Sequence, residues 1–184
     1  MLAPPVTFLF LITMNALSIK FPSLAQPMAS SKVMGLYFAA SWCPDCTSVT
    51  PIVHDVFQGV VGGTLDHPLR HHDQCHDDDH HHTNDTLAMV YISSDTTETQ
   101  MKLYVPKGWA TVPFDHVEER TGLKRDFGTC AGNEAGPLRV SRTFGIPTLI
   151  VVQCNTGKIL TTKGVDDVMK DKSGAVEKWL TMME

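Results

Sequence analysis

The sequence predicts an α/β fold in which a central mixed β-sheet is flanked by helices. Three short apolar runs have the length and composition of buried strands, near 33–40, 87–93 and 148–153. Segments with helical spacing separate these runs, and such alternation is typical of α/β domains. At 184 residues, a single globular domain with extensions is the simplest organisation.

The other elements follow in chain order. Apolar residues at helical spacing predict a helix over about 44–59, and Pro51 inside it is expected to kink the helix. A short helical turn is expected before Ile146. Further helices are predicted near 96–104, 115–127 and 175–182. A strand near 158–163 forms a hairpin with the third apolar run, because Gly157 between them suits a positive φ.

The N-terminus is assigned to a leader or possible signal segment, residues 1–28, ahead of a domain over 29–184. Val6 to Ile12 is largely apolar but too short to span a membrane, and residues 23–25 have the small side chains of a cleavage site. Against a signal peptide, no Lys or Arg precedes the apolar run, and two prolines stand at its start. The alternative is a strand or helix docked on the domain.

Two cysteines directly after the first strand carry the clearest chemical signal. Residues 42–46 are Trp-Cys-Pro-Asp-Cys, and a Cys-x-x-Cys pair between a strand and a helix is the geometry of thiol–disulfide exchange. Pro44 is favourable in the first helical turn, so Cys43 lies where free amides and the helix dipole stabilise a thiolate. We predict Cys43 as the nucleophile and Cys46 as the resolving thiol. The Asp45 carboxylate opposes a second negative charge nearby.

A structural zinc knuckle is the alternative for this pair. Such sites usually need a second pair of ligands at comparable spacing, whereas Cys75, Cys130 and Cys154 are scattered singly. Cys154 is expected to be a small apolar filler, and Cys130, in a Gly-rich stretch, an exposed and oxidisable thiol. Five cysteines is an odd number, which favours a reducing compartment over a secreted disulfide framework.

The third strand is preceded by Ile146-Pro147. Together with the upstream cysteine pair, this proline predicts a cis peptide bond. A cis-proline that faces the cysteines leaves the preceding backbone groups free to pair with an extended substrate. Ile146 and Pro147 are therefore predicted to bind substrate.

These motifs resemble the thioredoxin superfamily, in its nucleoredoxin/tryparedoxin branch. Residues 35–46, Gly-Leu-Tyr-Phe-Ala-Ala-Ser-Trp-Cys-Pro-Asp-Cys, are similar to the active-site segment of that branch. Further similar segments follow in the correct order at 88–95, 109–114, 145–149, 157–159 and 166–171. The resemblance covers about residues 30–172 and implies the thioredoxin fold.

Three positions depart from ordinary members. The branch usually has proline where Asp45 stands and a basic residue where Thr47 stands, and a Cys-Pro-Asp-Cys pair is similar to that of a small cytosolic group with narrow substrate range. Tyr37 occupies the position of the buried carboxylate of ordinary thioredoxins, as is usual in this branch. Tyr37 cannot accept a proton as a carboxylate would, so water or another group must serve the resolving thiol.

The function implied is protein-disulfide reduction, with protein disulfides as substrates. Trp42, Pro44 and Asp45 are expected around the nucleophile, with Trp42 and Pro44 forming an apolar rim. The resemblance suggests that Trp109 either lines this rim and binds substrate or packs beneath the loop. No bound cofactor is expected. The redox-active group is the Cys43–Cys46 pair, and without a nucleotide-binding fingerprint its electrons come from an upstream reductase or a small dithiol.

Two other functional classes stay open. A secretory address would favour a disulfide oxidase or isomerase. A redox-sensitive adaptor or a metal-binding protein is the other alternative. A net charge of −5 gives no support for nucleic-acid binding, and no membrane span is predicted. We expect a cytoplasmic location, with the nucleus as a further site, unless residues 1–25 are a signal segment.

Residues 60–86 are rich in His and Asp and are predicted to be a disordered loop insertion, because this composition cannot bury a core. Its candidate metal ligands are His71, His72, His76 and His80, of which successive members from His72 are four apart. Imidazoles suit zinc, copper or nickel, so weak binding of divalent metal is expected. Solvating charge and pH sensing are the alternatives. Residues 128–137 are predicted to be a second, Gly-rich insertion.

Overall fold

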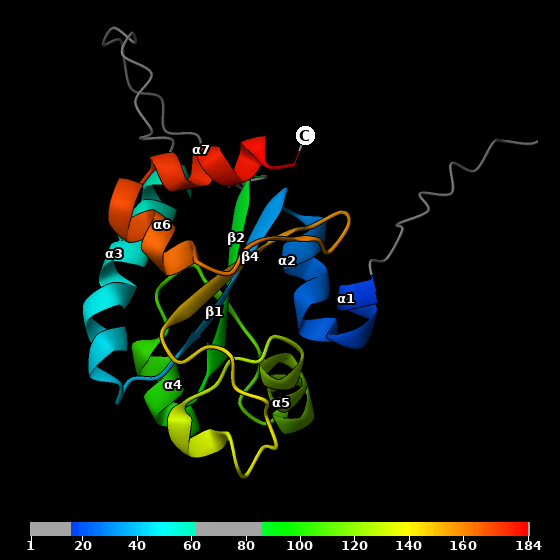
Figure 1. Cartoon of the computed structure of the whole chain (residues 1–184), viewed down its shortest axis with the longest axis vertical. Helices are drawn as coiled ribbons and strands as arrows, with labels where there is room; N and C mark the ends of the chain where they lie inside the picture. Colours follow the sequence, from blue (N-terminus) through cyan, green and yellow to red (C-terminus); the bar gives the residue numbers. More distant parts are fainter. Residues whose placement is uncertain (1–15, 62–85, 184) are drawn as a thin grey trace, which may run out of the picture.

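The computed structural model describes residues 16–61 and 86–183, and within them a five-stranded mixed sheet in the order β3-β2-β1-β4-β5 (Figure 1). The central strand β1 (Val33–Ala39) pairs in parallel with β2 (Leu87–Ser93) and antiparallel with β4 (Thr148–Gln153). The short strands β3 (Ala110–Thr111) and β5 (Ile159–Thr161) form the edges. This is the predicted α/β architecture.

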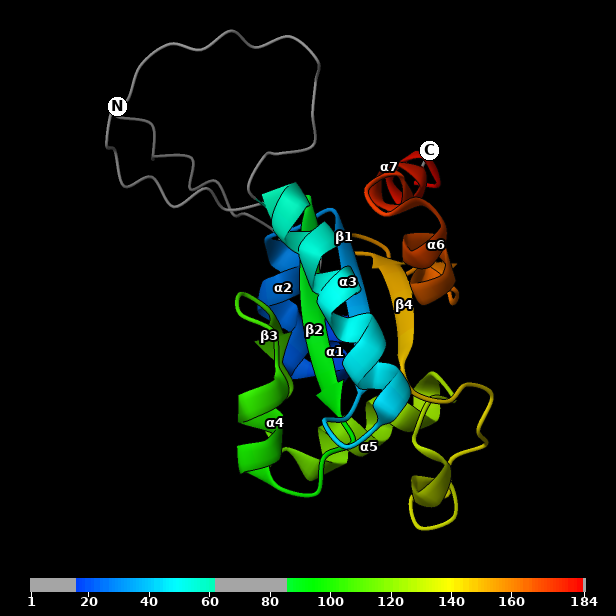
Figure 2. The same cartoon turned by 90° about the vertical axis from the view of Figure 1, so that its left-hand side faces the viewer.

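Helices cover both faces of the sheet. On one face lie α3 (Pro44–Val61), α4 (Glu98–Tyr104), α6 (Gly164–Asp171) and α7 (Gly174–Thr181). On the other lie α1 (Ala16–Lys20), the 3-10 turn η1 (Pro22–Leu24), α2 (Ala25–Ala29) and α5 (Val117–Asp126). A second 3-10 turn, η2 (Gly132–Glu134), follows α5. Figure 2 shows α3 in front of the sheet and α1 and α2 behind it.

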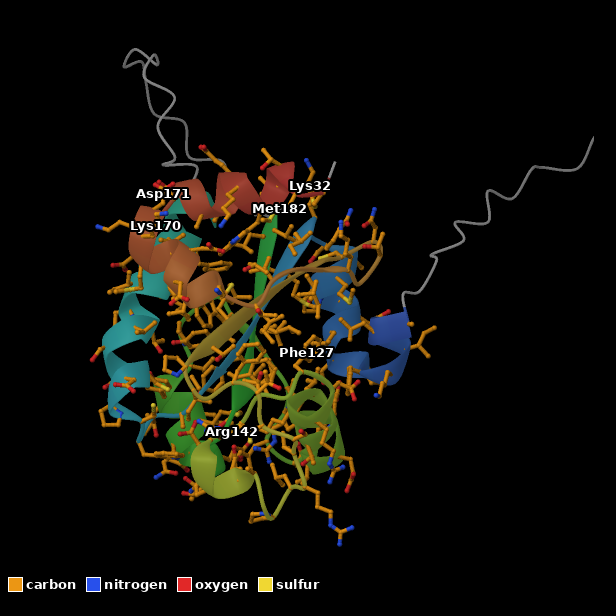
Figure 3. The ribbon with its side chains drawn as sticks, viewed as in Figure 1. Lys32, Phe127, Arg142, Lys170, Asp171 and Met182 are labelled. Carbon is orange, nitrogen blue, oxygen red and sulfur yellow. The ribbon has the colours of Figure 1, made fainter. Side chains whose placement is uncertain are left out.

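The central strand explains why its sequence is apolar without alternation. All seven residues of β1 are buried, because both faces of the strand are covered. Tyr37 belongs to the core under α3, whereas Phe38 belongs to the core under α5. There Phe38 packs against Phe127, with ring centroids 6.2 Å apart (Figure 3). The end of β1 is therefore fixed from both sides.

The N-terminal segment 16–29 is folded onto the domain. Phe21, Leu24 and Met28 are buried in the core beneath α5. The ring of Phe21 lies against Gly122 of α5, where an added Cβ would come within 2.9 Å of it. This arrangement is the docked-helix alternative, and cleavage within residues 23–25 would remove Phe21 from the core. The assignment of residues 1–28 to a leader stays a prediction.

Other expectations differ in detail. Helix α6 was not predicted, because it is only eight residues long, begins at a glycine and is rich in charged residues. The residues just before Ile146 are not helical. Pro51 lies inside helix α3, as expected, and the kink at this position stays a prediction. Most of the predicted 60–86 loop lies outside the described residues. Within those residues, no helix has both the length and the apolar character needed to cross a membrane.

The docked N-terminal segment yields a stability prediction. Leu24→Ala is expected to lower the free energy of unfolding by about 2–4 kcal/mol, because it leaves a cavity at a fully buried site. Ile19→Ala is the matched control, since Ile19 is 63% exposed in the same segment and should change stability by less than about 0.5 kcal/mol. Urea unfolding of both variants measures this. Equal effects would show that the segment does not contribute to the core.

Candidate active site

Three chain segments meet at one end of the sheet. Residues 41–46 follow β1, residues 93–95 end β2 and follow it, and Ile146-Pro147 precedes β4. The register places Phe38 opposite both Ile92 and Thr148, so the three segments emerge together. The Ile146–Pro147 peptide bond is cis, which confirms the prediction.

The dithiol lies at the start of α3. Cys43 is 6% exposed and Cys46 is fully buried, and both are free thiols. The Cys46 backbone N–H donates to Cys43 Sγ at 3.3 Å, as expected for a sulfur at a helix N-terminus. The Cys43 thiol in turn donates to the Ile146 carbonyl at 3.7 Å. The most exposed of the four described cysteines therefore faces the cis-proline segment.

The two cysteines differ in environment. Burial raises the pKa of the Cys46 thiol well above its ordinary value, and the hydrogen bond with Cys43 and the nearby Asp45 charge add to this. Cys46 is consequently a protonated thiol at neutral pH. Pro44 and Asp45 are both exposed on the first turn of α3, beside the mouth of the site.

Beneath the dithiol, three hydroxyl groups form a chain. The Tyr37 hydroxyl is 2.8 Å from Thr50 Oγ1, which is 2.7 Å from the Tyr104 hydroxyl. Burial raises the pKa of Tyr37 far above its usual range and that of Tyr104 to about 12, so both phenols stay protonated. Tyr37 therefore offers no negative charge to the Cys46 thiol. Thr50 and Tyr104 could not be identified from the sequence, because a chain of hydroxyl groups leaves no spacing pattern.

A buried carboxylate does lie at the end of β2. Asp95 accepts hydrogen bonds from the Ser41 backbone N–H at 2.7 Å, the Tyr91 hydroxyl at 3.0 Å and the Ser93 hydroxyl at 2.8 Å. The bond to Ser41 ties the segment ahead of the dithiol to β2. From the sequence, Asp95 stood out only as a member of a segment that is similar to the family. In the structure it is buried and bonded to Ser41, which places it beside the site.

Comparison with known proteins decides the family. Residues 31–159 match a family model described as thioredoxin-like. The chain belongs to this family. Tryparedoxin from Trypanosoma brucei brucei is 28% identical over 149 residues, covering 80% of this chain and 79% of that protein. Nucleoredoxin-like protein 1 from Homo sapiens is 27% identical over 154 residues, covering 81% of this chain but 57% of that protein.

Solved structures agree with this assignment. A structure of tryparedoxin from Trypanosoma brucei superposes with a TM-score of 0.56 at 25% identity, covering 85% of this chain and 97% of that one. The tryparedoxin and nucleoredoxin relatives confirm the predicted branch. This thioredoxin-like chain is accordingly a thioredoxin-type oxidoreductase.

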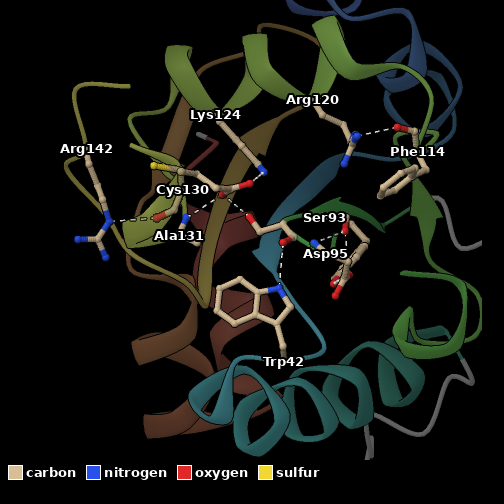
Figure 4. A network of polar contacts seen from close by, with 12 residues as sticks. Trp42, Ser93, Asp95, Phe114, Arg120, Lys124, Cys130, Ala131 and Arg142 are labelled. Carbon is tan, nitrogen blue, oxygen red and sulfur yellow. Dashed lines mark hydrogen bonds and ion pairs between the residues drawn. The ribbon is translucent and has the colours of Figure 1, made fainter. Parts of the chain in front are cut away.

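Trp42 stands at the mouth of the site and is fixed by its indole. It is 43% exposed, as expected, and Nε1 donates to the Ser94 carbonyl at 3.1 Å. Ser94 Oγ donates to Glu134 at 2.7 Å, and Glu134 also accepts from Lys124 Nζ at 2.5 Å and from the Ala131 N–H at 3.0 Å. Figure 4 shows this network running from Trp42 to α5.

The ion pair in the network is largely buried. The Lys124 side chain is 3% exposed and that of Glu134 is 21% exposed. Burial lowers the pKa of Lys124, and the Glu134 charge opposes this lowering. Residues 128–137, predicted as a Gly-rich insertion, thus supply the carboxylate that holds the Ser94 loop. Lys124 and Glu134 are 10 positions apart and follow no helical or strand periodicity, so the sequence gives no sign of their contact.

The expectation that Cys130 is exposed was wrong. Cys130 is fully buried, and its backbone N–H donates to the Phe144 carbonyl at 3.4 Å. A β-bridge between Thr129 and Phe144 holds the Cys130 segment against the residues before β4. Burial raises the pKa of the Cys130 thiol. The glycines around Cys130 suggested an open loop, but they do not indicate the pairing of Thr129 with Phe144. Cys154 is buried at the end of β4, which confirms its prediction as an apolar filler.

The structure favours the packing alternative for Trp109. Trp109 is 7% exposed and packs edge-on against Tyr37 and Phe57, with ring centroids 5.3 and 6.2 Å away. Its Nε1 has no hydrogen-bond partner within the described part of the chain. A direct contact between Trp109 and substrate stays a prediction.

Metal binding is not addressed by the described residues. Residues 16–61 and 86–183 contain no group of three or more His, Cys, Asp or Glu side chains placed to hold a metal ion. The candidate ligands lie outside these ranges, at His71, His72, His76 and His80. A metal site in the His-rich segment therefore stays a prediction.

The buried ion pair yields a second stability prediction. Glu134→Gln is expected to lower the free energy of unfolding by about 1–3 kcal/mol, because the buried Lys124 ammonium loses its compensating charge. Glu98→Gln is the matched control, since its pair with Lys102 is more than half exposed and should matter little. Urea unfolding at neutral pH compares the two variants.

The sign of the pH dependence follows from Lys124. Its pKa is lowered in the folded protein, so the unfolded chain binds more protons between that pKa and the ordinary value of 10.5, and stability rises with pH there. Loss of Glu134 lowers the folded pKa further. The deficit of Glu134→Gln should therefore shrink as pH rises from about 7 to about 10. A deficit that is constant over this range would contradict the assignment.

Proposed function

We propose that this chain is a protein-disulfide reductase in which Cys43 attacks the substrate and Cys46 resolves the mixed disulfide. The observation that carries this proposal is the placement of Cys43. Its sulfur lies at the N-terminus of α3, 3.7 Å from the Ile146 carbonyl, with the buried Cys46 one helical turn behind it. A slightly exposed nucleophile, a fully buried second thiol and a backbone edge for substrate are the parts that the reaction needs.

The reaction balances over two exchange steps. The Cys43 thiolate attacks one sulfur of the substrate disulfide, forming a mixed disulfide and releasing the first substrate thiolate, which takes up a proton. The Cys46 thiolate then attacks Cys43 sulfur and releases the second substrate thiolate, which is also protonated. The substrate gains two electrons and two protons, and the protein becomes the Cys43–Cys46 disulfide. An upstream reductase or a small dithiol returns two electrons to the pair.

Substrate binding uses the groups around Cys43. An extended substrate segment pairs with the backbone at Ile146, beside the cis-proline Pro147. The exposed Trp42 and Pro44 form an apolar rim on the other side of the sulfur. The exposed Asp45 carboxylate narrows the range of substrates by repelling negative groups near the first turn of α3.

The proton on Cys46 has to leave during the second step. The neighbouring Tyr37 and Tyr104 phenols are protonated, and the Asp95 carboxylate is engaged by three donors. We assign the acceptor role to water or to the substrate thiolate released in the first step. The reductive direction fits a cytoplasmic or nuclear location, and none of the four described cysteines forms a disulfide.

Insulin-disulfide reduction with dithiothreitol as electron source tests the dithiol. The wild-type protein should reduce insulin, and Cys43→Ser should fall to the uncatalysed rate because no nucleophile remains. Cys46→Ser should instead accumulate a covalent mixed disulfide with insulin, detectable by mass spectrometry. Cys154→Ser is the matched control, since Cys154 is buried at the far end of β4 and should retain activity.

Failure would be informative. A folded wild-type protein that does not turn insulin over, and whose Cys46→Ser variant traps no disulfide, would contradict the reductase proposal. An adaptor or metal-binding role would then be the remaining class.

The pH dependence of the second step follows from Cys46. Because its pKa is raised, the thiolate fraction is small and grows about tenfold per pH unit from about pH 6 to about pH 8. With 5,5′-dithiobis(2-nitrobenzoate), the first release of thionitrobenzoate reports attack by Cys43 and the second reports resolution by Cys46. The second rate constant should rise about tenfold per pH unit. A plateau below about pH 8 would show that Cys46 is not the buried, protonated group described here.

A further inference from the structure

An arginine lies against the proposed substrate edge. Arg142 is exposed, and its Nε donates to the Cys130 carbonyl at 3.0 Å. A Cβ added to Gly145 would lie 2.5 Å from a terminal nitrogen of the Arg142 guanidinium. The guanidinium therefore rests on the Gly145 backbone. Figure 3 labels Arg142 between η2 and β4, and Figure 4 shows its bond to Cys130.

Gly145 links this charge to the site through the chain. It directly precedes Ile146, whose carbonyl is 3.7 Å from Cys43 Sγ. Any side chain at position 145 would meet the guanidinium, so glycine is the residue that permits this close approach. The Arg142 guanidinium thus contacts the residue next to Ile146, and the Ile146 carbonyl faces Cys43.

The guanidinium is held in place but retains free donors. Its anchor, the Cys130 carbonyl, belongs to a segment fixed by the bridge between Thr129 and Phe144. Only Nε is used by that bond, and Arg142 makes no ion pair with any of the described residues. The terminal nitrogens of arginine form a planar fork that matches a carboxylate. Anchoring reduces the entropy lost when such a group binds.

We propose that Arg142 is a specificity-determining residue that binds a carboxylate of the disulfide substrate, next to the cysteine under attack. This inference rests on the proposed function of Cys43 and Cys46. Asp45, exposed on the first turn of α3, disfavours a carboxylate on its own side of the sulfur. The preferred substrate therefore carries its acidic group on the side of the Ile146 edge. The position of that group relative to the substrate cysteine decides whether it can reach Arg142.

Matched peptide disulfides test the proposal. Short peptides with one cysteine and a Glu at each flanking position in turn, or Gln in its place, are oxidised to dimers and mixed with the reduced protein. The second-order rate constant for oxidation of the protein is followed by stopped flow. At one position, Glu should react about three- to fivefold faster than Gln, and the preference should diminish at about 1 M NaCl.

Variants separate charge recognition from folding. Arg142→Gln should abolish the preference, so that the Glu and Gln peptides react at equal rates, and Arg142→Lys should retain part of the preference. Arg125→Gln is the matched control, because Arg125 is also exposed and its Nε also donates to a carbonyl, that of Leu138 at 2.8 Å. This control should keep the full preference.

The outcomes distinguish two failures. A wild-type protein that reduces insulin and the Gln peptides but shows no Glu preference at any position would overturn the Arg142 proposal alone. A preference that survives in Arg142→Gln would do the same. A folded protein that reduces neither insulin nor any peptide would overturn the reductase proposal, and the Arg142 proposal with it.

Discussion

The pairing of β1 with its two neighbours is the constraint on which the site depends. Because β2 runs parallel to β1 and β4 runs antiparallel to both, the end of β1, the end of β2 and the start of β4 fall together. The dithiol, the Ser93–Asp95 segment and the cis-proline each come from one of these three places. Burial of every residue of β1 fixes this register, because a slip by one residue would move each side chain of β1 to the opposite face of the sheet.

Polar bonds then fix what the register brings together. Asp95 holds the Ser41 backbone and the Ser94 carbonyl holds Trp42, so the segment before Cys43 is tied to the end of β2 at two successive residues. Glu134 and Lys124 extend this attachment to α5. The mouth of the site is therefore supported by residues that lie more than eighty positions away from it in the chain. Its geometry depends on the fold as a whole.

Elements of the fold and site could be predicted where they leave a local pattern in the sequence. Strands β1, β2 and β4 are continuous apolar runs, and Cys43 and Cys46 form a local spacing motif, so sequence alone located them. The cis bond at Pro147 needed the upstream cysteine pair in addition. Lys124 and Glu134 meet across a turn without periodicity, so their contact could not be inferred. Composition misled at Cys130, because glycines describe local backbone freedom and not the long-range pairing of Thr129 with Phe144.

The lengths of the outer strands have a consequence for how this molecule meets other chains. The described sheet ends in strands of two residues on one side and three on the other. Long exposed edges invite indiscriminate strand addition and aggregation, and edges this short offer few free backbone groups. Under the proposed reductase function, the backbone at Ile146 is then the selective docking point, so that capture of a partner and attack on its disulfide occur at the same place.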